Sequence, residues 1–85
     1  MKLADNMFSL VIASVDKILF QGSVLSVTCP GSEGELTVLP GHIPLVTALS
    51  PGFVKIKETT DKEDCVFEIT GGVLEVSGEG AVILI

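Results

Sequence analysis

The segment Gly31–Gly52 constrains the fold of this 85-residue chain more than any other. It contains four of the nine glycines, three of the four prolines and the single histidine. Glycine permits backbone reversals that other residues resist, and proline fixes φ and removes a hydrogen-bond donor. A segment of this composition is incompatible with a helix. It predicts two short strands, Leu36–Leu39 and Leu45–Leu49, held between shaped turns on a rigid surface that suits docking by another protein.

Alternation of apolar and polar residues indicates strands elsewhere. Val24–Cys29 and Cys65–Thr70 both alternate, which predicts a half-buried strand in each. The side chains expected to face the core are Leu25, Val27, Cys65, Phe67 and Ile69. Met7–Val15 is apolar at nearly every position, which is typical of a central strand or of one covered on both faces.

Turn residues divide the chain into nine strand-like runs, and no window is long enough for a helix. The runs are Met7–Val15, Ile18–Phe20 (ended by Gly22), Val24–Cys29, Leu36–Leu39, Leu45–Leu49, Phe53–Lys57, Cys65–Thr70, Val73–Val76 and Ala81–Ile85. We therefore expect a single all-β domain over residues 1–85, a flattened β-sandwich or barrel without a helix longer than one turn.

The amino-acid composition excludes some classes of function. Hydrophobic residues make up 47% of the chain, yet no apolar run approaches the roughly 18 residues of a membrane-spanning helix. The net charge is −6, with five basic residues, which argues against nucleic-acid binding. An electrostatically attracted partner should be basic.

His42 is the natural candidate for acid–base chemistry, with Cys29 as a nucleophile or with Cys29, Cys65 or Glu35 as metal ligands. No second histidine and no Cys-x-x-Cys spacing supports either reading. We expect His42 to fix a turn or contact a partner, and the cysteines to be two buried free thiols, although a disulfide is geometrically possible. No catalytic residue, metal or cofactor is expected.

The loop Gly31–Glu35 lacks the basic residues of a phosphate-binding loop, and its carboxylates would repel phosphate. Two alternatives remain for Glu33 and Glu35: a solvated turn, or a docking site for a basic surface.

Gly31–Gly52, with the sequence GSEGELTVLPGHIPLVTALSPG, closely resembles the signature of the epsilon subunit of bacterial F-type ATP synthases. Gly71–Val76 and the run Val82–Leu84 do so too, and Phe8–Gly22 and Val24–Pro30 fit in the correct order. The resemblance covers essentially the whole chain. It implies the N-terminal β-sandwich of that subunit, with about ten short, mostly antiparallel strands.

In that family the domain is a non-catalytic part of the central rotor stalk. It binds the gamma subunit and the c ring, and so couples proton flow to ATP synthesis. Most members continue into a C-terminal helical hairpin that inhibits ATP hydrolysis and in some of them binds ATP. This sequence ends where the hairpin would begin, so no nucleotide binding or inhibitory role is expected.

The resemblance also implies contact residues for gamma and the c ring. Glu33 and Glu35 would face the basic polar loops of the c ring, and Ser14, His42 and Thr47 match positions at or near the gamma and c contacts. The expected location is peripheral, on the cytoplasmic face of the bacterial inner membrane, without membrane insertion and without a targeting segment. The alternatives are an unrelated β-sandwich adaptor and a small His/Cys hydrolase.

Overall fold

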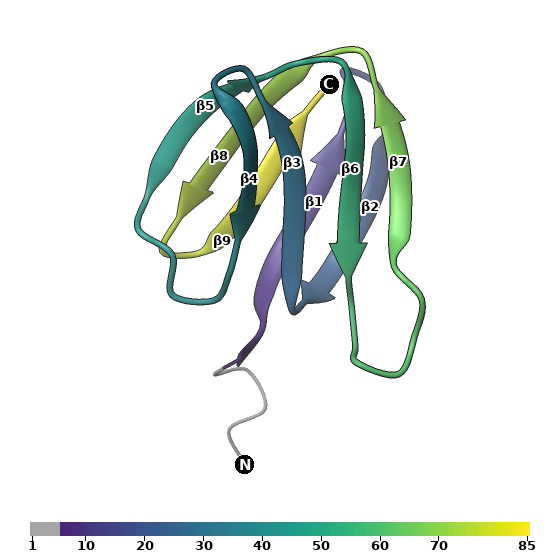
Figure 1. The fold of residues 1–85 in the computed structure, drawn as a ribbon, viewed down its shortest axis with the longest axis vertical. Helices are drawn as coiled ribbons and strands as arrows, with labels where there is room; N and C mark the ends of the chain where they lie inside the picture. Colours follow the sequence, from purple (N-terminus) through teal and green to yellow (C-terminus); the bar gives the residue numbers. More distant parts are fainter. Residues whose placement is uncertain (1–5) are drawn as a thin grey trace.

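A computed structural model describes residues 6–85, and strands dominate it (Figure 1). The nine strands are β1 (Phe8–Ala13), β2 (Ile18–Val24), β3 (Ser26–Gly31), β4 (Gly34–Val38), β5 (Leu45–Leu49), β6 (Gly52–Lys57), β7 (Cys65–Ile69), β8 (Gly72–Ser77) and β9 (Gly80–Leu84). They correspond to the nine predicted runs, and the all-β class is confirmed. A tenth strand is not found among residues 6–85. The same residues contain no helix long and apolar enough to cross a membrane.

The strands form one continuous sheet that folds back on itself into two layers (Figure 1). One layer has the strand order β2-β1-β9-β8-β5, and the other has the order β4-β3-β6-β7. All pairs are antiparallel except β1 with β9, which are parallel. We call the two layers the five-stranded layer and the four-stranded layer.

The two layers join at one backbone pair, Gly31 with Leu49. Hydrogen bonds from Ser32 N–H to Ala48 C=O and from Ser50 N–H to Pro30 C=O hold the chain on either side of this pair. A Cβ on Gly31 would lie 2.6 Å from the Gly34 carbonyl oxygen, so the corner has no room for a side chain. Gly31, the first residue of the glycine- and proline-rich segment, therefore lies where the sheet bends.

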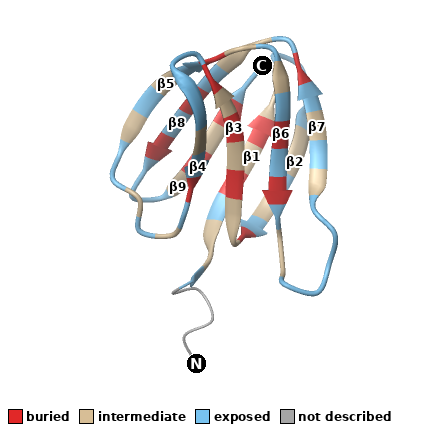
Figure 2. Cartoon of the chain, in the orientation of Figure 1, coloured by how far each residue is buried: buried red, intermediate tan, exposed pale blue. Residues whose placement is uncertain are grey.

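The core lies between the layers, and the burial of residues alternates along most strands (Figure 2). Fourteen apolar side chains are buried, and no polar side chain among residues 6–85 is. The buried set is Leu10, Ile12, Val24, Val27, Cys29, Val38, Leu49, Val54, Ile56, Ile69, Leu74, Val76, Ala81 and Ile83. Opposite the corner, the rings of Phe20 on β2 and Phe67 on β7 meet edge to face with centroids 6.3 Å apart, which closes the other side of the sandwich.

Four of the five predicted core residues face the interior. Val27 and Ile69 are buried, while Cys65 and Phe67 pack against the core from partly exposed positions. The prediction for Leu25 was wrong, because Leu25 lies in the bend between β2 and β3 and is half-buried.

Strand β2 is longer than the sequence indicated. Gly22 does not end it, because Gly22 pairs with Leu10 of β1 and the strand continues to Val24, which is fully buried. The Phe20 ring lies 3.8 Å from where a Gly22 Cβ would be. A neighbouring aromatic ring thus covers the space that the glycine leaves, and the strand tolerates it.

Strand β1 is an inner strand, as its apolar sequence predicted, with β2 on one side and β9 on the other. Within this chain it is covered on one face. Leu10 and Ile12 are buried against the core, whereas Val11 and Ala13 on the opposite face are half-buried. The apolar residues of this second face have no cover from residues 6–85.

Gly80 and Gly78 offer a matched test of backbone packing in the β8–β9 turn. Gly80 has φ +137° and a Cβ there would lie 2.5 Å from the Ser9 carbonyl oxygen, while a Cβ on Gly78 would meet nothing within 4 Å. We expect Gly80→Ala to lower the free energy of unfolding by about 1–3 kcal/mol, and Gly78→Ala to change it by about 0.5 kcal/mol or less. Urea unfolding measures both. Equal stabilities would contradict the close approach of β1 to the start of β9.

Candidate docking surface

The five residues expected at the partner contacts do not form one cluster. β4 runs antiparallel to β3, so the β3–β4 turn with Glu33 and the segment after β4 with His42 lie at opposite ends of the sandwich (Figure 1). The five residues of β4 separate these ends by about 16 Å. We call them the Glu33 end and the His42 end.

Glu33 and Glu35 are exposed, but they do not share one loop. Ser32 and Glu33 form a two-residue turn between the paired residues Gly31 and Gly34. Glu35 belongs to β4 and pairs with Pro30, so its side chain is held on the outer face of the four-stranded layer. One carboxylate therefore projects from the tip of a tight hairpin, and the other lies beside it.

Ser14 also lies at the Glu33 end. It follows the last residue of β1, Ala13, which accepts a hydrogen bond from the N–H of Ile85. The Ser14 hydroxyl donates to the Asp16 carboxylate at 3.0 Å. Ala13 and Ala48 belong to one row of paired residues across the five-stranded layer. The carbonyl of Ala48 accepts a hydrogen bond from the N–H of Ser32, which is the neighbour of Glu33. Ser14 and Glu33 thus border the same edge of the five-stranded layer.

His42 lies in a β-turn whose shape follows from its sequence. The His42 N–H donates to the Leu39 carbonyl at 3.1 Å, and Gly41 between them has φ +80°. Pro40 at the second position and a positive φ at the third define a type II turn. The His42 Nδ1 lies 2.8 Å from the Ile43 carbonyl oxygen, which fixes the ring when Nδ1 carries the proton. This agrees with the prediction that His42 shapes a turn.

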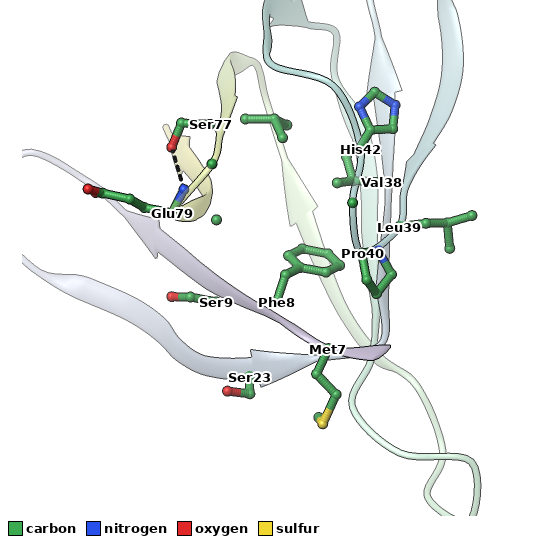
Figure 3. Close-up of a pocket in the computed structure, with 14 residues that line it drawn as sticks. Met7, Phe8, Ser9, Ser23, Val38, Leu39, Pro40, His42, Ser77 and Glu79 are labelled. Carbon is green, nitrogen blue, oxygen red and sulfur yellow. Dashed lines mark hydrogen bonds between the residues drawn. The ribbon is translucent and has the colours of Figure 1, made fainter. Parts of the chain in front are cut away.

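His42 borders an open cleft of about 660 Å³ at the His42 end. Figure 3 shows His42, Val38 and Leu39 on one wall, Ser77 and Glu79 on the other, and the Phe8 ring between them. The second wall is a turn in which the Glu79 N–H donates to the Ser77 hydroxyl at 3.2 Å. Cys29 does not line this cleft.

The structure argues against nucleophilic or metal chemistry at His42. Cys29 is fully buried in the core, and burial raises the pKa of its thiol from 9.0 to about 11. Such a thiol is protonated at neutral pH and a poor nucleophile. Within residues 6–85 no three His, Cys, Asp or Glu side chains gather closely enough to hold a metal ion. Cys29 and Cys65 are both unbonded, and Cys65 is half-buried, which corrects the expectation of two buried thiols.

The outer face of the five-stranded layer is a second candidate docking surface, and none of its residues was named as a partner contact from the sequence. Its strand register aligns two rows of outward side chains, which we call the apolar face. One row contains Val46, Glu75, Val82, Val11 and Gln21, and the other contains Ala48, Val73, Leu84, Ala13 and Ile18. Val46 is 69% exposed, Ile18 58% and Leu84 52%.

The apolar face is large for a solvent-facing surface. Five strands about 4.8 Å apart, each presenting about 17 Å of length, cover on the order of 20 × 17 Å. Contiguous apolar patches of several hundred Å² are uncommon on monomers and mark binding sites. Strands that are apolar at consecutive positions, as in Ala81–Ile85 and Met7–Val15, carried the signal for this face.

The outer face of the four-stranded layer has a different character. Thr37, Thr28, Lys55 and Val66 form one row across it, and the two threonine hydroxyl oxygens lie 3.0 Å apart. At its edge, Lys57 Nζ lies 3.4 Å from the Asp64 carboxylate. The sandwich therefore presents one largely apolar outer face and one mixed outer face, on which Phe53 and Val66 are exposed beside the charged residues.

A small β-sandwich with an uncovered apolar face has the features of a protein-interaction domain. Comparison with known protein families identifies the kind of interaction domain. Residues 7–85 match the family described as ATP synthase, Delta/Epsilon chain, beta-sandwich domain, and the chain belongs to this family. The resemblance recognised in the sequence is confirmed.

Two bacterial relatives are similar over most of the chain. An ATP synthase epsilon chain from Chlorobium limicola is 40% identical over 84 residues, which are 99% of this chain and 94% of that protein. One from Herminiimonas arsenicoxydans is 41% identical over 73 residues, covering 86% of this chain and 52% of that protein. The chain thus spans nearly all of one relative and about half of the other.

Solved structures have the same fold. A chain of the Euglena gracilis mitochondrial ATP synthase, from a structure of OSCP, F1 and c-ring, superposes with a TM-score of 0.84 at 28% identity, over 93% of this chain and 50% of that one. A chain of the Tetrahymena thermophila mitochondrial central stalk and c-ring structure gives a TM-score of 0.73 over 91% of this chain and 61% of that one. At 19% identity the second match supports the fold alone.

The two cysteines should differ sharply in reactivity. In the native protein at pH 8.5 we expect iodoacetamide to modify the half-buried Cys65 and to spare Cys29, because burial raises the pKa of the Cys29 thiol to about 11. Mass spectrometry of the digested protein measures both sites. The variant Cys65→Ser isolates Cys29, which should react after denaturation in urea. Rapid native alkylation of Cys29 would contradict its place in the core.

Proposed function

We propose that this chain is a non-catalytic subunit of the central rotor stalk of a proton-translocating F-type ATP synthase. It binds the gamma subunit and the c ring and transmits torque between them. Its relatives are bacterial epsilon chains, which supports a location on the cytoplasmic face of the bacterial membrane, peripheral to it. The observation that carries the proposal is the family match over residues 7–85 together with the uncovered apolar face.

The apolar face is the proposed gamma-binding surface. It runs between the two ends of the sandwich, so a partner that covers it reaches Ser14 at the Glu33 end and the segment after His42 at the other. This accounts for the separation of these expected contact residues. Thr47 lies on the inner side of the edge strand β5, half-buried beside outward-facing Val46 and Ala48, and contacts a partner at the edge of this face.

The Glu33 end is the proposed c-ring contact. Glu33 and Glu35 are exposed on and beside a rigid hairpin, and the net charge of −6 favours a basic partner. The partner is the set of polar loops of the c ring. In this arrangement gamma takes the apolar face and the ring takes the adjoining end, so both bind one chain at once.

Co-purification tests the proposal directly. A tagged form of this chain, expressed with the gamma subunit and c ring of the same bacterium, should retain both through gel filtration. Recovery of the chain alone would overturn the rotor assignment.

Val46 and Val66 provide a matched pair for locating the gamma contact. Both are exposed valines on edge strands, at 69% and 55%, but Val46 lies on the apolar face and Val66 on the opposite layer. We expect Val46→Asp to weaken gamma binding at least about tenfold, because a carboxylate would be desolvated in the contact. Val66→Asp should stay within about twofold of the parent. Equal affinities of the two variants, measured by calorimetry, would rule out the apolar face.

Glu33→Gln with Glu35→Gln tests the c-ring contact. Exposed charge pairs contribute about 0–1 kcal/mol each, so the double variant should associate several times more slowly with the gamma–c-ring assembly at low salt. The difference should vanish at high salt, since complementary charge acts mainly on encounter. Surface plasmon resonance at two ionic strengths measures this. Unchanged association in both conditions would make these residues a solvated hairpin.

A further inference from the structure

One charged residue lies inside the apolar face. Glu75 projects from β8, which has β5 and β9 as neighbours in the five-stranded layer. In its row Val46 is directly opposite on one side and Val82 on the other. Val73, two residues away on β8, points to the same face. Side chains directly opposite in antiparallel strands have Cβ atoms about 5 Å apart, so Glu75 is surrounded by valines on three sides.

No ion pair to Glu75 is found among residues 6–85, and Lys17 lies in the turn before β2, separated from β8 by β1 and β9 in the layer. The ion pair found among residues 6–85 joins Lys57 and Asp64 at the edge of the other layer. Lys55 projects from the outer face of the four-stranded layer, and Lys62 lies in the exposed loop between β6 and β7. Glu75 is exposed among residues 6–85, where water solvates its carboxylate.

A partner that covers the apolar face removes this water. A carboxylate deprived of solvent and left unpaired is strongly unfavourable, whereas one that meets a cation with good hydrogen-bond geometry is compensated. Arginine suits such a position best, because its guanidinium is weakly hydrated and binds a carboxylate through two parallel hydrogen bonds. The valines around Glu75 would exclude water from the pair and strengthen it.

We propose that the gamma subunit presents an arginine or lysine to Glu75 from within an apolar surface, and that this ion pair fixes the register in which gamma lies on the sheet. Outward apolar side chains repeat every two residues on β5 and β9, so apolar contact alone allows gamma to lie one residue pair further along the strands. A single buried charge pair distinguishes one such position from the next. The proposal rests on the proposed function, since it names the chemistry of the partner at the same surface.

The experiment measures dissociation of gamma from three variants, Glu75→Gln, Glu75→Lys and the control Glu68→Gln. Glu68 is an exposed carboxylate on β7 that faces out from the four-stranded layer, so it matches the charge change away from the proposed contact. We expect dissociation to be ten- to a hundredfold faster for Glu75→Gln and faster still for Glu75→Lys. Glu68→Gln should stay within twofold. Loss of a desolvated pair acts on dissociation, so the effect should persist in 0.5 M salt.

A charge-reversal screen identifies the partner residue. Each arginine and lysine on gamma is changed to glutamate and tested against Glu75→Lys, and one reversal should restore the parent dissociation rate. If Glu75→Gln dissociates like the parent while Val46→Asp blocks binding, Glu75 stays hydrated and the ion pair is refuted, with the proposed function intact. If the parent chain does not bind gamma at all, both proposals fail. Thermal unfolding of each variant checks that the fold is unchanged.

Discussion

The bend at Gly31 and Leu49 is the constraint on which the other features depend. The backbone pair between these two residues continues the sheet from the four-stranded layer into the five-stranded layer. The apolar inner faces of the two layers can therefore pack against each other within one sheet. The close approach of the Gly34 carbonyl leaves no room for a Cβ at Gly31. The same geometry holds Ser32 against Ala48, and this fixes the Glu33 hairpin relative to the edge of the five-stranded layer. Core, hairpin and docking face therefore share one backbone corner.

Much of the fold could be predicted from local patterns. Alternation located Val27 and Ile69 in the core, and glycine with proline marked the turns around β4 and β5. Errors arose where contacts with other residues outweighed a local sequence preference, such as the tendency of glycine to end a strand. Gly22 did not end β2, because pairing with Leu10 and the Phe20 ring compensate for its missing side chain. Phe20 is visible within residues 18–25, but the pairing with Leu10 is not.

The site was harder to predict, because it depends on which strands are neighbours. The consecutive apolar residues of β1 were visible in the sequence and predicted a central strand or one covered on both faces. The row that joins Val46, Glu75 and Val82 exists because β8 lies between β5 and β9. Within β8 the alternation of Glu75 with buried Leu74 and Val76 is that of any half-buried strand. Its valine surroundings become apparent once the strand order is known.

The parallel pairing of β1 with β9 has a consequence for biosynthesis. β9 lies between β1 and β8, so the five-stranded layer stays in two parts until residues 80–84 have left the ribosome. At roughly 5–20 residues per second, β1 waits about 4–14 s after its own synthesis for this neighbour. The hairpins β3–β4 and β6–β7 close locally in that time, whereas Leu10 and Ile12 remain without their final packing. During that interval β1 has only its hairpin partner β2, and its inner residues Leu10 and Ile12 remain accessible to nascent-chain chaperones.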